Sequence, residues 1–246
     1  DLVRSRGLGD VYKRQNPLFL AVIYFLLVSV IRGGSSKTNG FTTLCHILIG
    51  LFTFYFAQNT ILAGAQSITS GGRLILNQAF PRSLLPLSSA LSAARQFMPT
   101  IPVYIAVVVI GKFAFPDANL PGLTWNYLFL PLLLIPLAVT SFGLALLFAT
   151  MNVYFRDTSK LLTYITRIWL YASPVLWLPE MVHGWHRIIL YLNPLGPVLS
   201  ANSRIWIEGL APTVAQLVAS AIWSVLALLL GGYFFISRER DFAVRI

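Results

Sequence analysis

The apolar residues of this chain gather in runs long enough to cross a lipid bilayer as helices, and this pattern constrains the fold more than any other feature. A membrane-spanning helix needs about 20 consecutive apolar residues, whereas a half-buried strand alternates apolar and polar residues. The chain has 246 residues, of which 57% are hydrophobic and 11% charged. Soluble domains carry roughly 25% charged residues. The sequence therefore predicts an all-α membrane protein.

Six apolar runs are predicted to span the membrane: residues 17–31, 41–65, 87–115, 123–150, 161–178 and 214–236. The first run is shorter than the roughly 17 residues that a span requires, so we interpret it as a truncated first span. Two more apolar runs, 185–192 and 195–207, are too short to cross and are interrupted by Pro194 and Pro197. We expect these two runs to form short re-entrant or interfacial helices before the last span.

Residues 1–15 differ from the rest of the chain. They lack an initiator Met, a hydrophobic segment and an amphipathic period, which excludes a signal peptide. Residues 5–14 also look like translated library or assembly sequence. We therefore expect residues 1–15 to be a non-native leader and residues 16–246 to form one transmembrane domain.

The net charge of +10 is best explained by membrane topology. Lys and Arg stand singly between the apolar runs and form no basic stripe, so no nucleic-acid partner is expected. Eleven of them fall in loops on one side of the predicted spans and five on the other, or seven against five without the leader. The positive-inside rule then places both termini in the cytoplasm.

The motifs of common catalytic sites do not occur in the sequence. Residues 33–38 have no Gly at the positions that a phosphate-binding P-loop requires. His183 and His186 lack a third metal ligand nearby, and the single cysteine, Cys45, can form neither an intrachain disulfide nor a Cys-based metal site. No acidic residue lies within a span, which argues against a proton relay. We predict no catalytic residue and no metal site.

Two polar segments separate the predicted spans. Residues 66–86 combine Gly71, Gly72 and a short apolar-polar alternation with Pro81, and we expect a short surface helix there. Arg156 and Asp157 precede the fifth run. Asp157 could cap the start of a helix, where the helix macrodipole favours a negative charge, or it could belong to a functional gate. In the fourth run, Ser141, Ala145 and Ala149 form a small-residue ridge that predicts close helix packing.

Several aromatic residues lie within or near the ends of the predicted spans. Most are expected to form membrane-interface belts. A minority could face a transport path, where flat rings suit the apolar faces of sugars. The candidates for such a path are Tyr55, Phe56, Tyr164, Trp169 and Tyr171.

Four short sequences, taken in order, resemble the type-two ABC transporter permeases that export lipid-linked polysaccharides such as O-antigen, galactan and teichoic acid. They are residues 74–86 (LILNQAFPRSLLP), 154–157 (YFRD), 173–175 (SPV) and 193–195 (NPL). Each sequence is weak evidence alone, but their order and spacing are specific. The resemblance covers nearly everything after Asn16.

The resemblance implies a six-span permease domain in the bacterial inner membrane that forms a homodimer and docks on two copies of a separate ABC ATPase. ATP and Mg would bind to that partner, so this chain would hold no cofactor. The implied coupling helix, which contacts the ATPase, includes Arg73, Leu74, Asn77, Phe80, Pro81 and Arg82. Arg156 and Asp157 match the family's gate region. The family's N-terminal interface helix has no counterpart in residues 1–15.

The implied substrate is a membrane lipid that carries a polysaccharide on a diphosphate. Arg73, Arg82, Arg95 and Arg156 are candidates to attract the diphosphate, although positive-inside topology alone would also place them there. Two alternatives are a permease of the same fold that exports a drug or small lipid, and an intramembrane glycosyl- or acyltransferase. The second would need an acidic residue or histidine within a span, and the predicted spans offer no suitable one.

Overall fold

The computed structural model describes residues 40–77, 80–114, 120–122, 124–179 and 188–245, together with Ile23, Leu26 and Gly184. Every regular element within these residues is helical. The predicted leader and nearly all of the predicted first span lie outside the described residues. The elements are α2 (Gly40–Ser70), α3 (Gly72–Asn77), α4 (Leu84–Phe97), α5 (Thr100–Ala114), η2 (Trp125–Leu128), α6 (Phe129–Tyr154), α7 (Thr158–Ala172), α8 (Ile188–Leu192), α9 (Gly196–Ser203), the π-helix η5 (Arg204–Glu208), α10 (Val214–Arg238), η6 (Glu239–Asp241) and α11 (Phe242–Arg245).

Four helical stretches in the described part are long and apolar enough to cross a bilayer. They are Gly40–Ser70, Leu84–Ala114, Trp125–Tyr154 and Val214–Asp241. These stretches confirm the predictions for residues 41–65, 87–115, 123–150 and 214–236.

The prediction of a fifth span over residues 161–178 is wrong in its bounds. Helix α7 ends at Ala172 and has 15 residues, which gives a length of about 22 Å, short of the roughly 30 Å of a bilayer core. Ser173 takes an extended conformation with ψ 153°, as expected for a residue before a proline. Pro174 therefore ends the helix within the apolar run.

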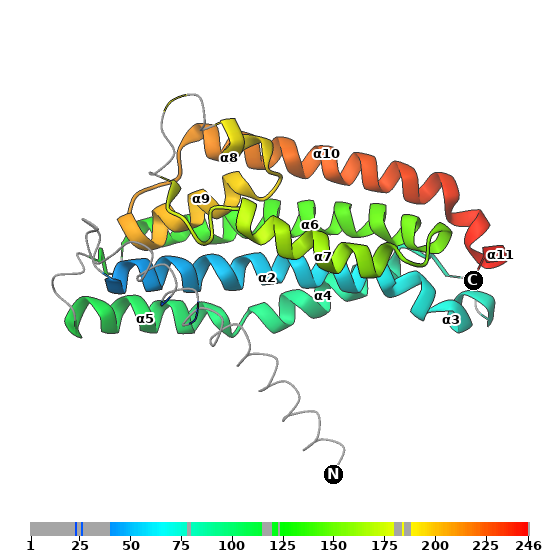
Figure 1. The fold of residues 1–246 in the computed structure, drawn as a ribbon, viewed down its shortest axis with the longest axis horizontal. Coiled ribbons are helices and arrows are strands. Elements are labelled where there is room, and N and C mark those ends of the chain that lie inside the picture. The colour runs from blue at the N-terminus through cyan, green and yellow to red at the C-terminus, as the bar shows by residue number, and fades with distance from the viewer. Residues whose placement is uncertain are drawn as a thin grey trace, which may run out of the picture.

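The long helices lie side by side, with α2 and α6 in the middle of the bundle (Figure 1). In helix α2, 72% of the spanning window is buried, against 28% in Leu84–Ala114 and in Val214–Asp241. One end of the bundle carries α3, α11 and the start of α7, and we call it the α3 end. The opposite end carries α8, α9 and η5, and we call it the α9 end.

Small residues set the contacts of α6 with both of its long neighbours. The predicted ridge of Ser141, Ala145 and Ala149 is fully buried, and a Cβ on Gly64 of α2 would come within 2.5 Å of the Ala145 side chain. This packing confirms the ridge. On the other face of α6, a Cβ on Gly231 of α10 would overlap the carbonyl oxygen of Gly143. Backbone therefore approaches backbone between α6 and α10.

The helical stretch 84–114 is broken once, between α4 and α5. Pro99 cannot donate a backbone hydrogen bond and interrupts the helical ladder there. The Thr100 hydroxyl donates to the carbonyl of Phe97 at 2.6 Å and so satisfies a group that the break leaves exposed. This break changes the helix path without ending the span.

Buried polar side chains join α2 to the α9 end. Asn202 Nδ2 donates to Thr53 Oγ1 at 2.9 Å. His46 Nε2 lies 3.2 Å from the Trp177 carbonyl oxygen, and its Nδ1 lies 2.7 Å from Ser203 Oγ. Because a carbonyl only accepts, Nε2 carries the proton of a neutral ring and Nδ1 accepts from Ser203. These bonds fix the depth at which α9 packs against α2.

Candidate functional site

Helix α3 presents two different faces at the α3 end of the bundle. Ile75 is buried in a cluster with Ile68 and Phe242. Leu74 and Leu76 are 49% and 61% exposed. The predicted surface helix is therefore present but shorter than residues 66–86, because α2 continues to Ser70 and α3 ends at Asn77.

Phe80, Pro81 and Arg82 lie in the turn before α4, outside any helix. Pro81 accepts from the Leu84 amide at 3.1 Å, and Phe80 packs at the edge of the same apolar cluster that holds Ile75. Arg82 is half-buried, and its Nη1 is buried without a hydrogen-bond partner among the described residues. The Arg73 and Asn77 side chains are exposed on α3 itself. Three of the six candidates thus lie on α3, and three lie in the turn before α4.

Residues of α11 pack against α3. The sequence analysis did not predict this contact. Phe242 of α11 is fully buried, and its ring lies 5.2 Å from that of Phe235. Tyr154 of α6 donates to Asp241 Oδ2 at 2.9 Å, while the Arg245 guanidinium lies 4.4 Å from the centre of the Tyr154 ring. The one sign of this contact in the sequence was Phe242, a large apolar residue within the charged segment 237–246. We call this arrangement of η6 and α11 the C-terminal clasp.

Arg156 and Asp157 are both exposed in the turn between α6 and α7. Asp157 occupies the N-cap position of α7, but its side chain makes no capping hydrogen bond. It instead forms an exposed ion pair with Lys160 at 3.3 Å. The prediction that the Asp157 side chain caps α7 is therefore wrong.

Asn152 performs the capping role. Its Oδ1 accepts from the backbone amide of Ser159 at 3.2 Å, in the first turn of α7. Its Nδ2 donates to Thr69 Oγ1 at 3.2 Å, near the end of α2. One buried side chain therefore joins α2, α6 and α7 directly beneath the turn that carries Arg156 and Asp157. The sequence offered no signal beyond a polar residue near the end of an apolar run.

Two of the five aromatic candidates take part in packing within the chain. Phe56 is buried, and its ring lies 5.2 Å from that of Phe97 on α4. The Trp169 ring meets the edge of Phe54 at 6.3 Å. Both side chains join α2 to a neighbouring helix.

The other three candidates reach the surface. Tyr164 and Tyr171 of α7 are 64% and 56% exposed, and Tyr55 is half-buried. The guanidinium of Arg167 lies 6.0 Å from the Tyr164 ring centre. One face of α7 therefore presents rings and a cation together.

Two of the sequences that carry the resemblance meet in space. Asn193 of NPL donates from Nδ2 to Ser173 Oγ of SPV at 2.9 Å. Its Oδ1 accepts from Trp169 Nε1 at 2.8 Å and from the Leu195 amide at 3.1 Å. These three hydrogen bonds tie the end of α7 to the start of α9. The two sequences are separated by 20 residues, so their pairing was not evident from spacing.

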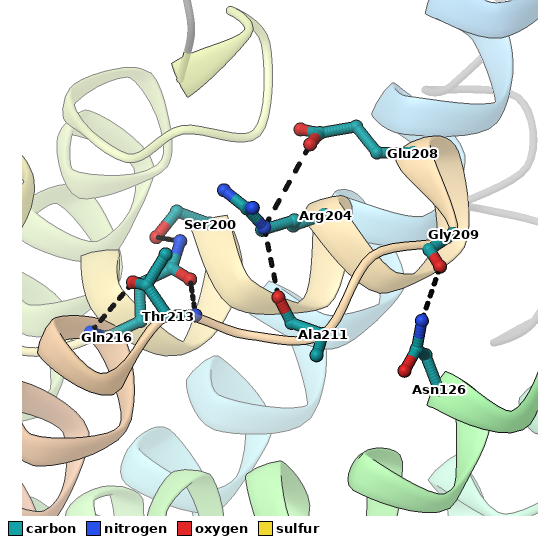
Figure 2. Close-up of polar contacts among 8 residues, drawn as sticks. All are labelled: Asn126, Ser200, Arg204, Glu208, Gly209, Ala211, Thr213 and Gln216. Carbon is teal, nitrogen blue, oxygen red and sulfur yellow. Dashed lines mark hydrogen bonds and ion pairs between the residues drawn. The ribbon is translucent and has the colours of Figure 1, made fainter.

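A second polar network holds the corner between η5 and α10 (Figure 2). Thr213 and Gln216 form a reciprocal capping box at the start of α10, and the Gln216 amide also donates to Ser200 of α9 at 3.2 Å. Arg204 donates to the Ala211 carbonyl at 3.0 Å, and Asn126 donates to the Gly209 carbonyl at 2.6 Å (Figure 2). These hydrogen bonds connect η5, α9 and α10, and Arg204 also forms a partly exposed ion pair with Glu208 at 4.0 Å.

No group of three His, Cys, Asp or Glu side chains in the described part of the chain could hold a metal ion. His183 and His186 lie outside the described residues. The coupling-helix candidates lie on α3 and in the turn before α4, and the gate candidates lie in the exposed turn between α6 and α7. The aromatic candidates are distributed between helix packing and an exposed face of α7.

Comparison with known proteins identifies the family. The chain matches the ABC-2 type transporter family over residues 1–205. It is 25% identical over 206 residues to the O-antigen export system permease protein RfbA of Klebsiella pneumoniae, which covers 84% of this chain and 75% of that protein. It is 24% identical over 248 residues to the protein of the same name from Myxococcus xanthus, which covers 99% of this chain and 90% of that protein. The chain therefore belongs to the ABC-2 type transporter family.

Proposed function

We propose that this chain is the membrane-spanning permease subunit of an ATP-driven exporter that moves a lipid-linked polysaccharide across the cytoplasmic membrane. The family and the names of the two relatives support this proposal. ATP and Mg bind to a separate ABC ATPase subunit in this scheme, and the permease does no chemistry on its substrate.

The observation that carries the coupling role is the two-faced helix α3. Its inner residue Ile75 sits in the core, whereas Leu74 and Leu76 expose apolar surface that a partner can cover. The exposed Arg73 on α3 and the half-buried Arg82 in the turn before α4 add cations that suit a carboxylate of the docked protein. An apolar centre with a cationic edge is the composition of a docking surface.

Charge supports a cytoplasmic position for the α3 end. Seven Lys and Arg residues belong to the elements and turns at that end: Arg73, Arg82, Arg156, Lys160, Arg238, Arg240 and Arg245. Among the described residues only Lys112 and Arg204 belong to the opposite end. The positive-inside rule favours this orientation. The same cations would attract the diphosphate of a lipid-linked sugar to this side of the membrane.

We infer six crossings, with residues 17–31 as the first and α7 together with the segment after it as the fifth. Helix α7 is too short to cross alone, and α8 and α9 follow it at the α9 end as short re-entrant or interfacial helices. A second copy of the chain would cover the exposed α7 face that carries Tyr164, Arg167 and Tyr171. A path between two such faces would offer rings to sugars and a cation to phosphate.

The test is a pair of charge substitutions read out by co-purification with the ATPase subunit. Leu76→Glu places a carboxylate on the exposed face of α3 and is expected to abolish co-purification. Leu210→Glu changes a leucine of similar exposure at the α9 end and is the matched control, expected to retain the ATPase. Equal binding by the two variants would refute the docking assignment.

The substrate class is tested on the purified complex of permease and ATPase. Lipid-linked polysaccharide is expected to stimulate ATP hydrolysis, whereas hydrophobic drugs and phospholipids are not. Stimulation by the drugs alone would favour the alternative exporter of small amphiphiles. Turnover of a lipid-linked sugar by the permease without any ATPase would favour an intramembrane transferase.

A further inference from the structure

A polar hollow of about 180 Å³ lies between α2 and α4. Its lining carries hydroxyl and amide side chains together with two alanines. The lining residues are Asn59 and Ala63 of α2 and Ser88, Ser89, Ser92, Ala93 and Gln96 of α4. We call this hollow the α2–α4 groove.

The groove lies well inside the membrane-spanning stretches. Asn59 is eleven residues before the end of α2, and Gln96 is twelve residues after the start of α4. At 1.5 Å per residue these positions lie about 16 and 18 Å from the ends of the two helices at the α3 end. Unpaired amides at such a depth are costly if they face lipid.

The polar groups of the groove have hydrogen-bonding capacity to spare. The hydroxyls of Ser88 and Ser89 donate to the Leu85 carbonyl at 2.8 and 3.3 Å and keep their acceptor positions free. Asn59, Ser92 and Gln96 make no hydrogen bond to another described residue. The two amides alone offer four N–H donors and two carbonyl acceptors.

The chemistry of the lining selects one class of ligand. Both donors and acceptors are present, none carries a charge, and no Lys, Arg, Asp or Glu lines the groove. A phosphate would lose its hydration without gaining a cation. A hydroxyl-rich neutral molecule can donate to and accept from every wall. The volume corresponds to about six water molecules, which suits one sugar unit.

We propose that the α2–α4 groove binds one neutral sugar unit of the substrate, separately from the cations and rings at the α3 end and on α7. This inference rests on the proposed function, since it assigns to the groove the saccharide part of that substrate. The diphosphate and the sugar are then held by different surfaces of the same chain.

The test uses the complex of permease and ATPase in detergent, with Cys45→Ala removing the only cysteine. Ser92→Cys places a thiol in the groove, and Leu91→Cys places one on the exposed apolar side of the same helix. A charged thiosulfonate reagent is expected to label Ser92→Cys at least tenfold faster than Leu91→Cys. Lactose should slow labelling of Ser92→Cys at least threefold, and inorganic phosphate should leave it unchanged.

A second substitution tests the amide. Gln96→Met keeps the length of the side chain and removes its hydrogen bonds, so the lactose concentration for half protection should rise roughly fivefold, the factor expected for one neutral hydrogen bond. Leu91→Met on the Ser92→Cys background is the control and should leave this concentration unchanged. Retained co-purification with the ATPase shows that each variant is folded.

Two outcomes would overturn the groove assignment: no protection by lactose, or equal protection by phosphate. Either result would leave the proposed function intact if lipid-linked polysaccharide still stimulates ATP hydrolysis. Conversely, lactose protection without such stimulation would support a saccharide site and refute the exporter.

Discussion

Two neighbouring glycines near the end of α10 are expected to respond to the same substitution with opposite signs. A Cβ on Gly231 would overlap the carbonyl oxygen of Gly143, whereas a Cβ on Gly232 would meet nothing within 4 Å. Replacement of Gly by Ala within a helix gains about 1 kcal/mol of helix propensity at either position. At Gly231 this gain is outweighed, because backbone atoms cannot rotate away and the two helices must separate.

The magnitude follows from the cost of overpacking. Forcing extra atoms into a close-packed contact costs about 1–3 kcal/mol, and a contact with backbone lies at or above the upper end. Gly231→Ala should therefore lower the free energy of unfolding by about 2 kcal/mol net, and Gly232→Ala should raise it by up to about 1 kcal/mol. For a chain of this size each kcal/mol shifts Tm by about 2–4 °C.

The assay is thermal unfolding of each variant in the same detergent, followed by intrinsic tryptophan fluorescence. Gly231→Ala should unfold about 4–8 °C below the parent chain, and Gly232→Ala at or slightly above it. Equal Tm values for the two variants would refute the close approach of α6 and α10. A rise in Tm for Gly231→Ala would refute it more directly.

Three further experiments, with five substitutions in all, test the α3 end and the α7–α9 junction. Phe242→Ala should loosen the C-terminal clasp, because replacing a buried phenylalanine by alanine costs about 3–5 kcal/mol. Hydrogen exchange should then rise in both α11 and α3. Unchanged exchange in α3 would contradict the contact between the clasp and α3. Phe80→Ala combined with Arg82→Glu should preserve membrane insertion and reduce ATPase co-purification at least tenfold, and undiminished co-purification would remove these residues from the docking surface. Asn193→Ala and Trp169→Phe should each lower Tm. In a double-mutant cycle, the double variant should lose about 1 kcal/mol less unfolding free energy than the sum of the two single losses. Fully additive losses would contradict the hydrogen bond between the two side chains.

The sequence predicted the four described long spans because length and apolar composition decide them locally. The bounds of 214–236 and 123–150 differ from the observed stretches by only a few residues. The end of α7 was missed because residues 175–178 are apolar and extend the hydrophobic run without being helical. Pro174 carried the correct signal, but hydropathy outweighed it.

The side-chain partners could not be predicted in the same way. Asp157 stands at the N-cap position of α7, but Asn152, seven residues before Ser159 and on α6, accepts from the Ser159 amide. The ridge at Ala145 was visible as a repeat, whereas Gly143 and Gly231 are single residues on helices far apart in sequence. Contacts of this kind depend on how the helices are arranged, and no local pattern specifies that arrangement.

The contacts at the α3 end define how a force on α3 would reach the rest of the permease. Helix α3 follows α2 directly, and Asn152 joins the last turns of α2 to the first turn of α7 through Thr69 and Ser159. Farther along, Gln58 donates to Thr166 at 2.9 Å, which joins the same two helices again. Because packed helices held at two levels move as one body, a shift of α3 would carry α2 and α7 together. The exposed ring face of α7 would then change position without any change in its own side-chain contacts. Under the proposed function, this rigid connection would transmit movement from the ATPase at α3 to a transport path beside α7.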